Sequence, residues 1–227
     1  MPSPIAYASK DNLRLRVTKL TPQGAPRTGS GNGYVTDAVI SVQRTPRVEA
    51  GQQNLQRNGA GTICQQNQES DTIVGQDLVV RLCTNDLTLI GMLTGAYTPS
   101  DGSGVMGYLE RGLDDGAPDP VCFEWWSYAW DNNGQATLAG APQYWHRVVP
   151  FVTFVHAQQT TERGLQVVEL NGKGSENKYI TINGPYDDWP TAIKTADGLV
   201  NRSFGEWREA SLPTASYSTI TVSSSAS

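Results

Sequence analysis

The chain has 227 residues, and 17 Lys and Arg against 22 Asp and Glu leave a formal net charge of −5. No apolar run approaches the roughly 18 residues that span a bilayer, and the start of the chain lacks a secretory signal pattern, so we expect no membrane association. An acidic chain without a Lys/Arg cluster is not built to grip nucleic-acid phosphates. Only 17% of the residues are charged, which favours a surface that meets other protein.

Strand patterns dominate the first part of the chain. Alternating polar and apolar residues predict strands at 12–17 and 76–83, and β-branched residues predict another at 34–42. Segment 21–33 is a Pro-, Gly- and Ser-rich loop. Segment 45–64 is rich in Gly, Gln and Asn and carries only a weak strand signal.

Apolar residues at helical spacing predict one short helix at about 85–94, roughly three turns long. Asn85 or Asp86 can cap its first turn, and Gly95 supplies a C-terminal stop. The following loop, 97–120, is rich in Gly and Asp, and a loop of this length is usually functional.

Segment 121–130 predicts a strong strand with aromatic side chains on both faces, so we expect a second sheet or a partner to cover both. A turn follows at 131–134, and Pro150 interrupts a strand over 144–156, which implies an edge strand or a bulge. The remaining predictions are strands at 165–170 and 178–182 joined by a turn at 171–174, a rigid turn at 184–190, and a short strand around Ile220 and Val222.

Many short strands, frequent turns and one helix predict a mainly β fold. We expect a β-sandwich or barrel with one short accessory α-helix and long loops.

The sequence offers no positive sign of an enzyme. Segment 171–175 approaches a phosphate-binding loop but lacks the Ser or Thr after the lysine and the earlier Gly. The acidic pairs are Asp114/Asp115 and Asp187/Asp188, whose adjacent carboxylates do not face each other across a cleft. A calcium loop at 114–119 would lack the EF-hand pattern, so turn acidity is the favoured interpretation. We expect no cofactor, no metal and no catalytic residue.

The cysteines and histidines are read as structural residues. Cys64, Cys83 and Cys122 are odd in number and form no CxxC pair, so we expect small buried residues in strands rather than a nucleophile or a disulfide. His146 and His156 are expected to be ordinary strand histidines.

Tryptophans leave two interpretations open. Trp125, Trp126, Trp130 and Trp145 could form core and subunit contacts, or they could stack on sugar rings as in carbohydrate-binding modules. Core or interface is favoured, because all four lie within predicted strands.

The order of several segments resembles that of the major tail tube proteins of long-tailed (siphovirus-type) bacteriophages, especially those that infect actinobacteria. The segments are 20–25, 39–42 leading to Pro46, 58–64, 81–86 with 93–95, 121–126, 147–151, 168–172 and 184–187. Together they extend over most of 13–190, whereas the chain after Trp189 carries little resemblance.

The resemblance implies one tail tube domain over 1–227, with an N-terminal arm at 1–11, the Gly-rich loop at 97–120 and a flexible Ser-rich end at 223–227. Such subunits form hexameric rings that stack head-to-tail, a heterologous contact that grows a tube. The implied partners are copies of itself, a tape measure protein, and tail terminator or tail tip proteins. The implied location is the virion tail, after assembly in the host bacterial cytoplasm.

An acidic lumen would let DNA pass without specific binding, since it repels phosphates. Three alternatives stay open: a head–tail connector or tail terminator that forms a single ring, a carbohydrate-binding β-sandwich of a tail tip, and, last, a hydrolase.

Overall fold

The fold is mainly β with one short α-helix, as the sequence predicts. The computed structural model describes residues 8–83, 86–131, 134–135, 137–138, 141–157, 167–179, 189–193, 199, 202–215 and 219–222. Its strands are β1 (Ala8–Lys19), β2 (Gly29–Thr36), β3 (Val39–Glu49), β4 (Gln53–Arg57), β5 (Ile63–Gln68), β6 (Thr72–Leu82), β7 (Val121–Asp131), β8 (Gly134–Gln135), β9 (Thr137–Leu138), β10 (Ala141–Pro142), β11 (Tyr144–His156), β12 (Val168–Ser175), β13 (Gly205–Glu209) and β14 (Thr219–Val222). The helix is α1 (Leu87–Thr94), and the short 3-10 turns are η1 (Leu113–Asp115) and η2 (Thr191–Ile193).

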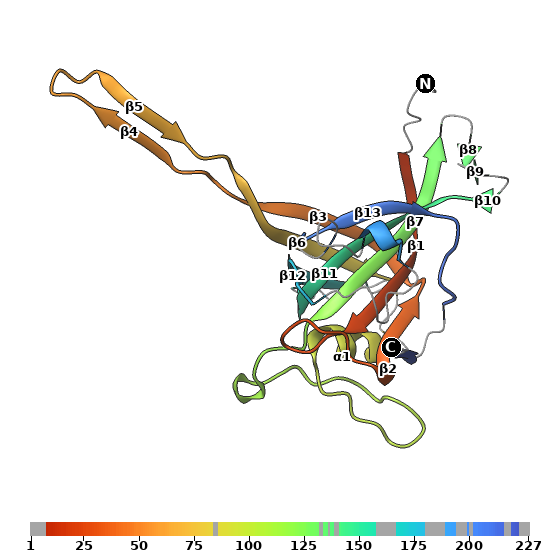
Figure 1. The fold of residues 1–227 in the computed structure, drawn as a ribbon. Coiled ribbons are helices and arrows are strands. Elements are labelled where there is room, and N and C mark those ends of the chain that lie inside the picture. The colour runs from red at the N-terminus through yellow and green to blue at the C-terminus, as the bar shows by residue number, and fades with distance from the viewer. Residues whose placement is uncertain are drawn as a thin grey trace.

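One curled antiparallel sheet forms the body (Figure 1). Its strand order is β14-β2-β1-β7-β11-β12-β6-β3, with β13 added to β11 and β8 added to β7. The curl brings β1 toward β3, where Asn12 Nδ2 donates to the Ile40 carbonyl at 3.5 Å. The body is therefore barrel-like, and α1 packs against β11.

Apolar side chains fill both faces of this sheet. The larger cluster combines residues of β1, β6, β7, β11 and β12 with Leu89, Ile90 and Leu93 of α1. A second cluster on the other face combines β7 and β11 with Trp189 and Trp207. Strand β7 is thus covered on both sides, as its aromatic residues predict, but the cover comes from the same curled sheet, from α1 and from Trp189 and Trp207 rather than from the expected second sheet.

Helix α1 uses the predicted caps Asp86 and Gly95 and ends at Thr94 as expected, but it begins at Leu87, so it is shorter than the predicted 85–94. The Asp86 carboxylate accepts from the Leu89 amide at 3.1 Å, and Gly95 closes the helix in the left-handed region at φ 67°. The eight residues make about two turns rather than three.

The strand predicted at 34–42 is wrong in one respect, because two strands meet there. A tight turn at Asp37 separates β2 from β3, and the Ala38 amide donates to Thr36 Oγ1 at 3.0 Å. Of the expected N-terminal arm at 1–11, residues 8–11 belong to β1, which corrects that part of the prediction, and 1–7 lie outside the described residues.

Pro150 marks a bulge, one of the two outcomes expected for it. Strand β11 runs through the proline without a break, and its register with β7 shifts between Val149 and Val152. The turn predicted at 131–134 is supported by its flanks, because Asp131 pairs with Gly134. The short strand expected around Ile220 and Val222 is β14.

The turn predicted at 171–174 is wrong: these residues form the middle of β12. A Cβ added to Gly172 would lie 2.6 Å from Phe154 Cε1, and one added to Gly174 would lie 2.5 Å from Val149 Cγ1. The glycines are there because large side chains of β11 occupy the space where their own would stand. The strand therefore begins at Val168 and ends at Ser175. The strand predicted at 178–182 and most of 184–190 fall outside the described residues, although 178–179 form a turn.

We expect Gly172→Ala to destabilise the protein by about 1–3 kcal/mol, because its methyl group would overpack the core against Phe154. Gly107→Ala is the control, since nothing lies within 4 Å of its added Cβ. Urea unfolding of both variants measures the difference. Equal midpoints would contradict this account of the β12 glycines.

Candidate functional site

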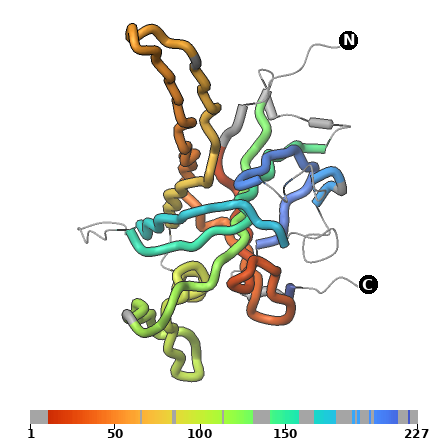
Figure 2. Tube along the Cα trace, turned by 60° about the vertical axis from the view of Figure 1, so that its left-hand side comes forward, coloured from red at the N-terminus to blue at the C-terminus, as the bar shows by residue number. Residues whose placement is uncertain are grey.

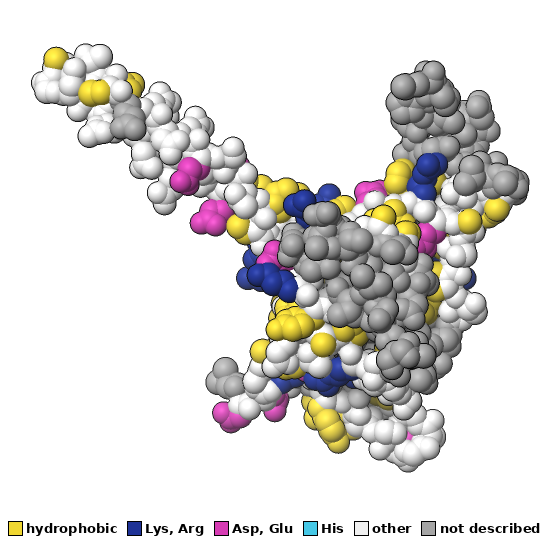
Figure 3. All heavy atoms as spheres, viewed as in Figure 1, with side chains coloured by type: hydrophobic (Ala, Val, Ile, Leu, Met, Phe, Trp, Pro, Cys, Tyr) yellow, Lys and Arg dark blue, Asp and Glu magenta, His cyan; other side chains and the backbone are white. Residues whose placement is uncertain are grey.

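A two-stranded arm projects from one end of the body (Figure 2). The outer parts of β3 and β6 leave the sheet as a pair, and β4 and β5 continue the projection to a tip at 58–62. Gln53 pairs with Gln68 and Asn54 with Asn67, so neutral amides line the ribbon. Figure 3 shows the arm as mainly white, with a few apolar side chains near the tip and acidic ones toward the body.

Within the described residues, the core clusters of the body do not extend into the arm. Every side chain of β4 is exposed, and neither core cluster includes a residue of 50–71. Strands β4 and β5 form their own two-stranded sheet, so within the described chain the outer edge of each is unpaired. Isolated two-stranded hairpins are marginal in water, and free edges are templates for pairing with another chain.

The long loop 97–120 lies at the other end of the body, below α1 in Figure 1. Bridges between Tyr97 and Leu109 and between Ser100 and Val105 give it a ribbon-like start. Tyr97, Leu109 and Met106 are each more than half exposed. The loop is thus irregular, as expected, and it presents large apolar side chains to solvent.

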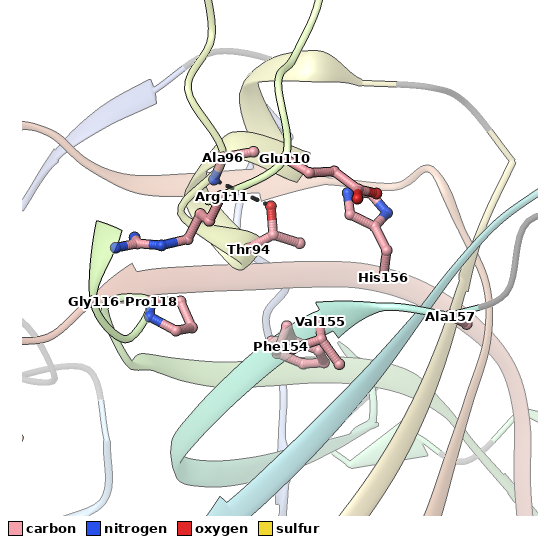
Figure 4. A pocket seen from close by; sticks show the side chains of 10 residues that line it. All are labelled: Thr94, Ala96, Glu110, Arg111, Gly116, Pro118, Phe154, Val155, His156 and Ala157. Carbon is pink, nitrogen blue, oxygen red and sulfur yellow. Dashed lines mark hydrogen bonds between the residues drawn. The ribbon is translucent and has the colours of Figure 1, made fainter. Parts of the chain in front are cut away.

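A cavity of about 520 Å³ lies where this loop meets α1 and the end of β11. Arg111 of the loop and His156 of β11 lie on opposite sides of it, with Thr94 between them (Figure 4). Arg111 braces the loop, since it donates to the carbonyls of Gly95 and Asp115.

Two nitrogens at this cavity lack hydrogen-bond partners. Among the described residues, only three buried side-chain N or O atoms are unpaired, and two of them are Arg111 Nε and His156 Nε2. Burial lowers the pKa of His156 despite the nearby Glu110 carboxylate. The ring is stacked on Tyr108, with centroids 4.9 Å apart.

A chain of buried charges crosses the opposite face of the sheet. Glu124 of β7 is fully buried and accepts from Arg16 Nε at 2.6 Å and Nη2 at 2.7 Å. His146 places Nε2 3.0 Å from Glu124 Oε1 and Nδ1 2.8 Å from Glu209 Oε1. Both ring nitrogens face carboxylates, so both carry protons and the ring is an imidazolium. The four charges therefore balance.

Three tryptophans complete this network. Trp189 donates to Glu124 at 2.9 Å, and Trp207 and Trp126 donate to Glu209 at 2.6 and 3.2 Å. The Trp126 ring stacks on His146 with centroids 4.0 Å apart, a favourable position for a cation.

The network sets the protonation of its members. Burial alone would lower the pKa of His146, but its hydrogen bonds to Glu124 and Glu209 raise it above the ordinary value. Burial alone would raise the pKa of both carboxyls, yet Arg16 and His146 hold the pKa of Glu124 low, and His146 does the same for Glu209.

The predicted residues have mixed outcomes. Cys122 is buried, but Cys64 and Cys83 are exposed, so the expectation of three buried cysteines is wrong. Cys64 lies on the arm and is exposed. His146 and His156 are in a strand as expected, although His146 is an ion-paired residue rather than an ordinary one.

The favoured interpretation as core residues is confirmed for two of the four tryptophans, and the described acidic pair lies in a turn as expected. Trp125 and Trp126 are buried, whereas Trp130 is 37% exposed and Trp145 is half-buried. Asp114 and Asp115 belong to η1, where the Asp115 carboxylate accepts from the Gly112 amide. Asp187 and Asp188 lie outside the described residues.

Sequence reasoning missed the arm and the charge network. The arm's signal was a Gln- and Asn-rich stretch around the Asn58-Gly59 turn, but its residues have low strand propensity. A lone Glu124 amid apolar residues signals a buried partner. Its partners Arg16 and His146, and Glu209 beyond His146, are too distant in sequence to be named from the pattern.

No model of a known protein family matches the chain, and no curated protein matches it. In the part of the chain that the structure describes, no cluster of three or more His, Cys, Asp or Glu could hold a metal ion. Across the same residues, none of the helices has the length and apolar character needed to cross a membrane.

Glu209→Gln tests the charge network, because it keeps the shape and removes one charge. The stability from His146 is complete below its unfolded pKa near 6.5 and is lost as pH rises through its raised folded pKa. That from the two carboxyls is present above about 4.5 and is lost as pH falls through their lowered folded pKa values. The Tm of the wild type should therefore be highest between about pH 4.5 and 6.5 and should fall at both lower and higher pH.

The free energy of unfolding of Glu209→Gln should be about 1–3 kcal/mol lower than that of the wild type. The fall in Tm on the alkaline side should begin at lower pH, since His146 loses a counter-charge. The control Glu206→Gln, on the same strand, removes the partly exposed ion pair with Arg147. It should lower the free energy of unfolding by less than about 1 kcal/mol and leave the alkaline fall in Tm at the wild-type pH. Thermal melts from pH 4 to 9 decide. Superimposable alkaline limbs of wild type and Glu209→Gln would contradict the assignment.

Proposed function

We propose that this protein is a structural subunit that assembles with copies of itself into a hollow tube, and specifically the major tail tube subunit of a long-tailed bacteriophage. The rings would be hexameric and stack head-to-tail, and DNA would pass through the lumen. The proposal rests on the order of resembling segments, on the mainly β barrel-like body and on the arm.

The arm is the observation that carries the proposal. Among the described residues this ribbon has two unpaired edges and no core of its own, an arrangement poorly suited to an isolated molecule, whereas contact with a neighbouring copy would cover it. The arm and the loop 97–120 leave opposite ends of the body in both Figure 1 and Figure 2. Two different surfaces at opposite ends are what a heterologous, non-closing contact requires.

The formal net charge of −5 fits a conduit for DNA, because an acidic lumen repels phosphates and prevents binding. The tape measure protein and the terminator and tip proteins of a tail are further proposed partners. No catalytic step is part of this function.

The alternatives differ in what they need from the structure. A connector or terminator would use similar interfaces but stop at one ring. A carbohydrate-binding module needs exposed aromatic rings, and Trp125 and Trp126 are both buried. This burial favours an assembly role over a sugar platform.

Negative-stain electron microscopy of the purified chain tests the proposal, with long striated tubes expected. The matched control replaces 50–71 by an Asn-Gly turn, since Glu49 and Thr72 already pair across β3 and β6. The free energy of unfolding of the armless variant should stay within about 0.5 kcal/mol of the wild-type value, because the replaced residues are surface residues outside the core. The armless variant should form no tubes. Single rings of the wild type would favour the connector. A monomer, or tubes without the arm, would contradict the proposal.

A further inference from the structure

We propose that Asn58, at the tip of the arm, is a site of spontaneous deamidation through a cyclic imide, and that the fold directs this modification to one of several identical dipeptides. The chain contains five Asn-Gly dipeptides, at Asn32, Asn58, Asn133, Asn171 and Asn183. Asn133 and Asn183 lie outside the described residues. Glycine after asparagine favours the reaction, because no Cβ hinders the approach of its backbone nitrogen. This chemistry is independent of the proposed assembly.

The reaction needs only the chain and water. The Gly59 backbone nitrogen loses its proton and attacks Asn58 Cγ, so that a new C–N bond closes a five-membered succinimide ring. The bond between Cγ and Nδ2 breaks, and the departing nitrogen takes up the proton and leaves as ammonia. Water then opens the ring at one of its two carbonyls and leaves aspartate or isoaspartate at this position. A neutral amide thus becomes a carboxylate, with no change of oxidation state.

At the arm tip, the groups that react are exposed and free of hydrogen bonds that would hold them back. Asn58 and Gly59 are exposed, and within the described chain neither the Gly59 amide nor Asn58 Nδ2 makes a hydrogen bond. Asn58 Oδ1 accepts from the amides of Ala60 and Thr62 at 3.0 and 2.9 Å. These two donors stabilise the negative charge that develops on Oδ1 during the attack. The tip therefore leaves the nucleophile and the leaving group free and activates the carbon that joins them.

Asn32 has the same neighbour in sequence but a different backbone. Gly33 lies in β2 and pairs with Thr18 of β1 on one side and with Ile220 of β14 on the other. Asn32 Nδ2 also donates to the Thr28 carbonyl at 2.8 Å. The sheet holds the nucleophile in an extended strand and this hydrogen bond holds the leaving nitrogen, so the reaction at Asn32 has to wait for β2 to open.

Asn171 shows that an exposed side chain is not sufficient. Its side chain is exposed like that of Asn58, yet Gly172 lies in the middle of β12. Gly172 pairs with Phe154 of β11 and with Leu78 of β6, so its backbone is held between two strands. A succinimide ring would bend the chain at this point and break the ladder. Backbone freedom therefore selects Asn58 among the described Asn-Gly dipeptides.

Peptide mapping by mass spectrometry tests this ranking on the full-length, dispersed chain. In mildly alkaline buffer, Asn58 should convert to aspartate and isoaspartate at least about tenfold faster than Asn32 or Asn171, because strand segments react only when they open. The same chain in urea is the control. Unfolding removes the backbone restraints, so the three rates should converge there.

Gly59→Ala is the matched variant at the tip. Nothing lies within 4 Å of its added Cβ, so its Tm should equal that of the wild type. The methyl group hinders the attacking nitrogen and should slow conversion of Asn58 by about tenfold, with Asn32 and Asn171 unaffected. Conversion of Asn32 or Asn171 in the folded chain as fast as that of Asn58, or an Asn58 rate that Gly59→Ala leaves unchanged, would overturn the inference.

Discussion

Glu124 is a charged side chain with no exposed surface, and its carboxylate lies on the strand that the whole sheet is built around. An uncompensated charge in such a place is prohibitively costly, so the neighbouring strands must bring partners. Strand β1 brings Arg16 and β11 brings His146, which in turn needs Glu209 of β13. The requirement therefore favours β1 and β11 as the strands that flank β7, and the indole groups of three tryptophans donate to the two carboxylates of the network.

The arm differs from the body because it is exposed rather than covered. Within the body, apolar clusters cover both faces of the sheet, whereas in the described part of the chain the ribbon of β4 and β5 has neither a core nor an edge partner. A buried ion network stabilises the body, whereas the ribbon is exposed to solvent. The body therefore serves as a scaffold, and the ribbon is the part available for contact with another molecule. Its neutral amides keep the ribbon soluble without giving it a charge that would repel another acidic copy of the chain.

The fold class, the cap residues of α1, the bulge at Pro150 and the double-sided burial of β7 could all be predicted, because each depends on local pattern or on a residue with special backbone chemistry. The turn predicted at Gly172 and Gly174 was wrong for a physical reason. Their sequence is typical of a turn, but it is the bulk of Phe154 and Val149 across the sheet that requires glycine. The arm and the charge network could not be predicted, since one has weak strand propensity and the other joins residues as far apart as Arg16 and Glu209.

Hydrogen–deuterium exchange of the arm, with β7 as internal reference, tests the central claim that a second copy covers this ribbon. The account predicts rapid exchange in 53–57 and 63–68 of the dispersed chain, strong protection of the same segments in the assembled state, and slow exchange of β7 in both. An arm that exchanges equally fast before and after assembly would contradict the claim.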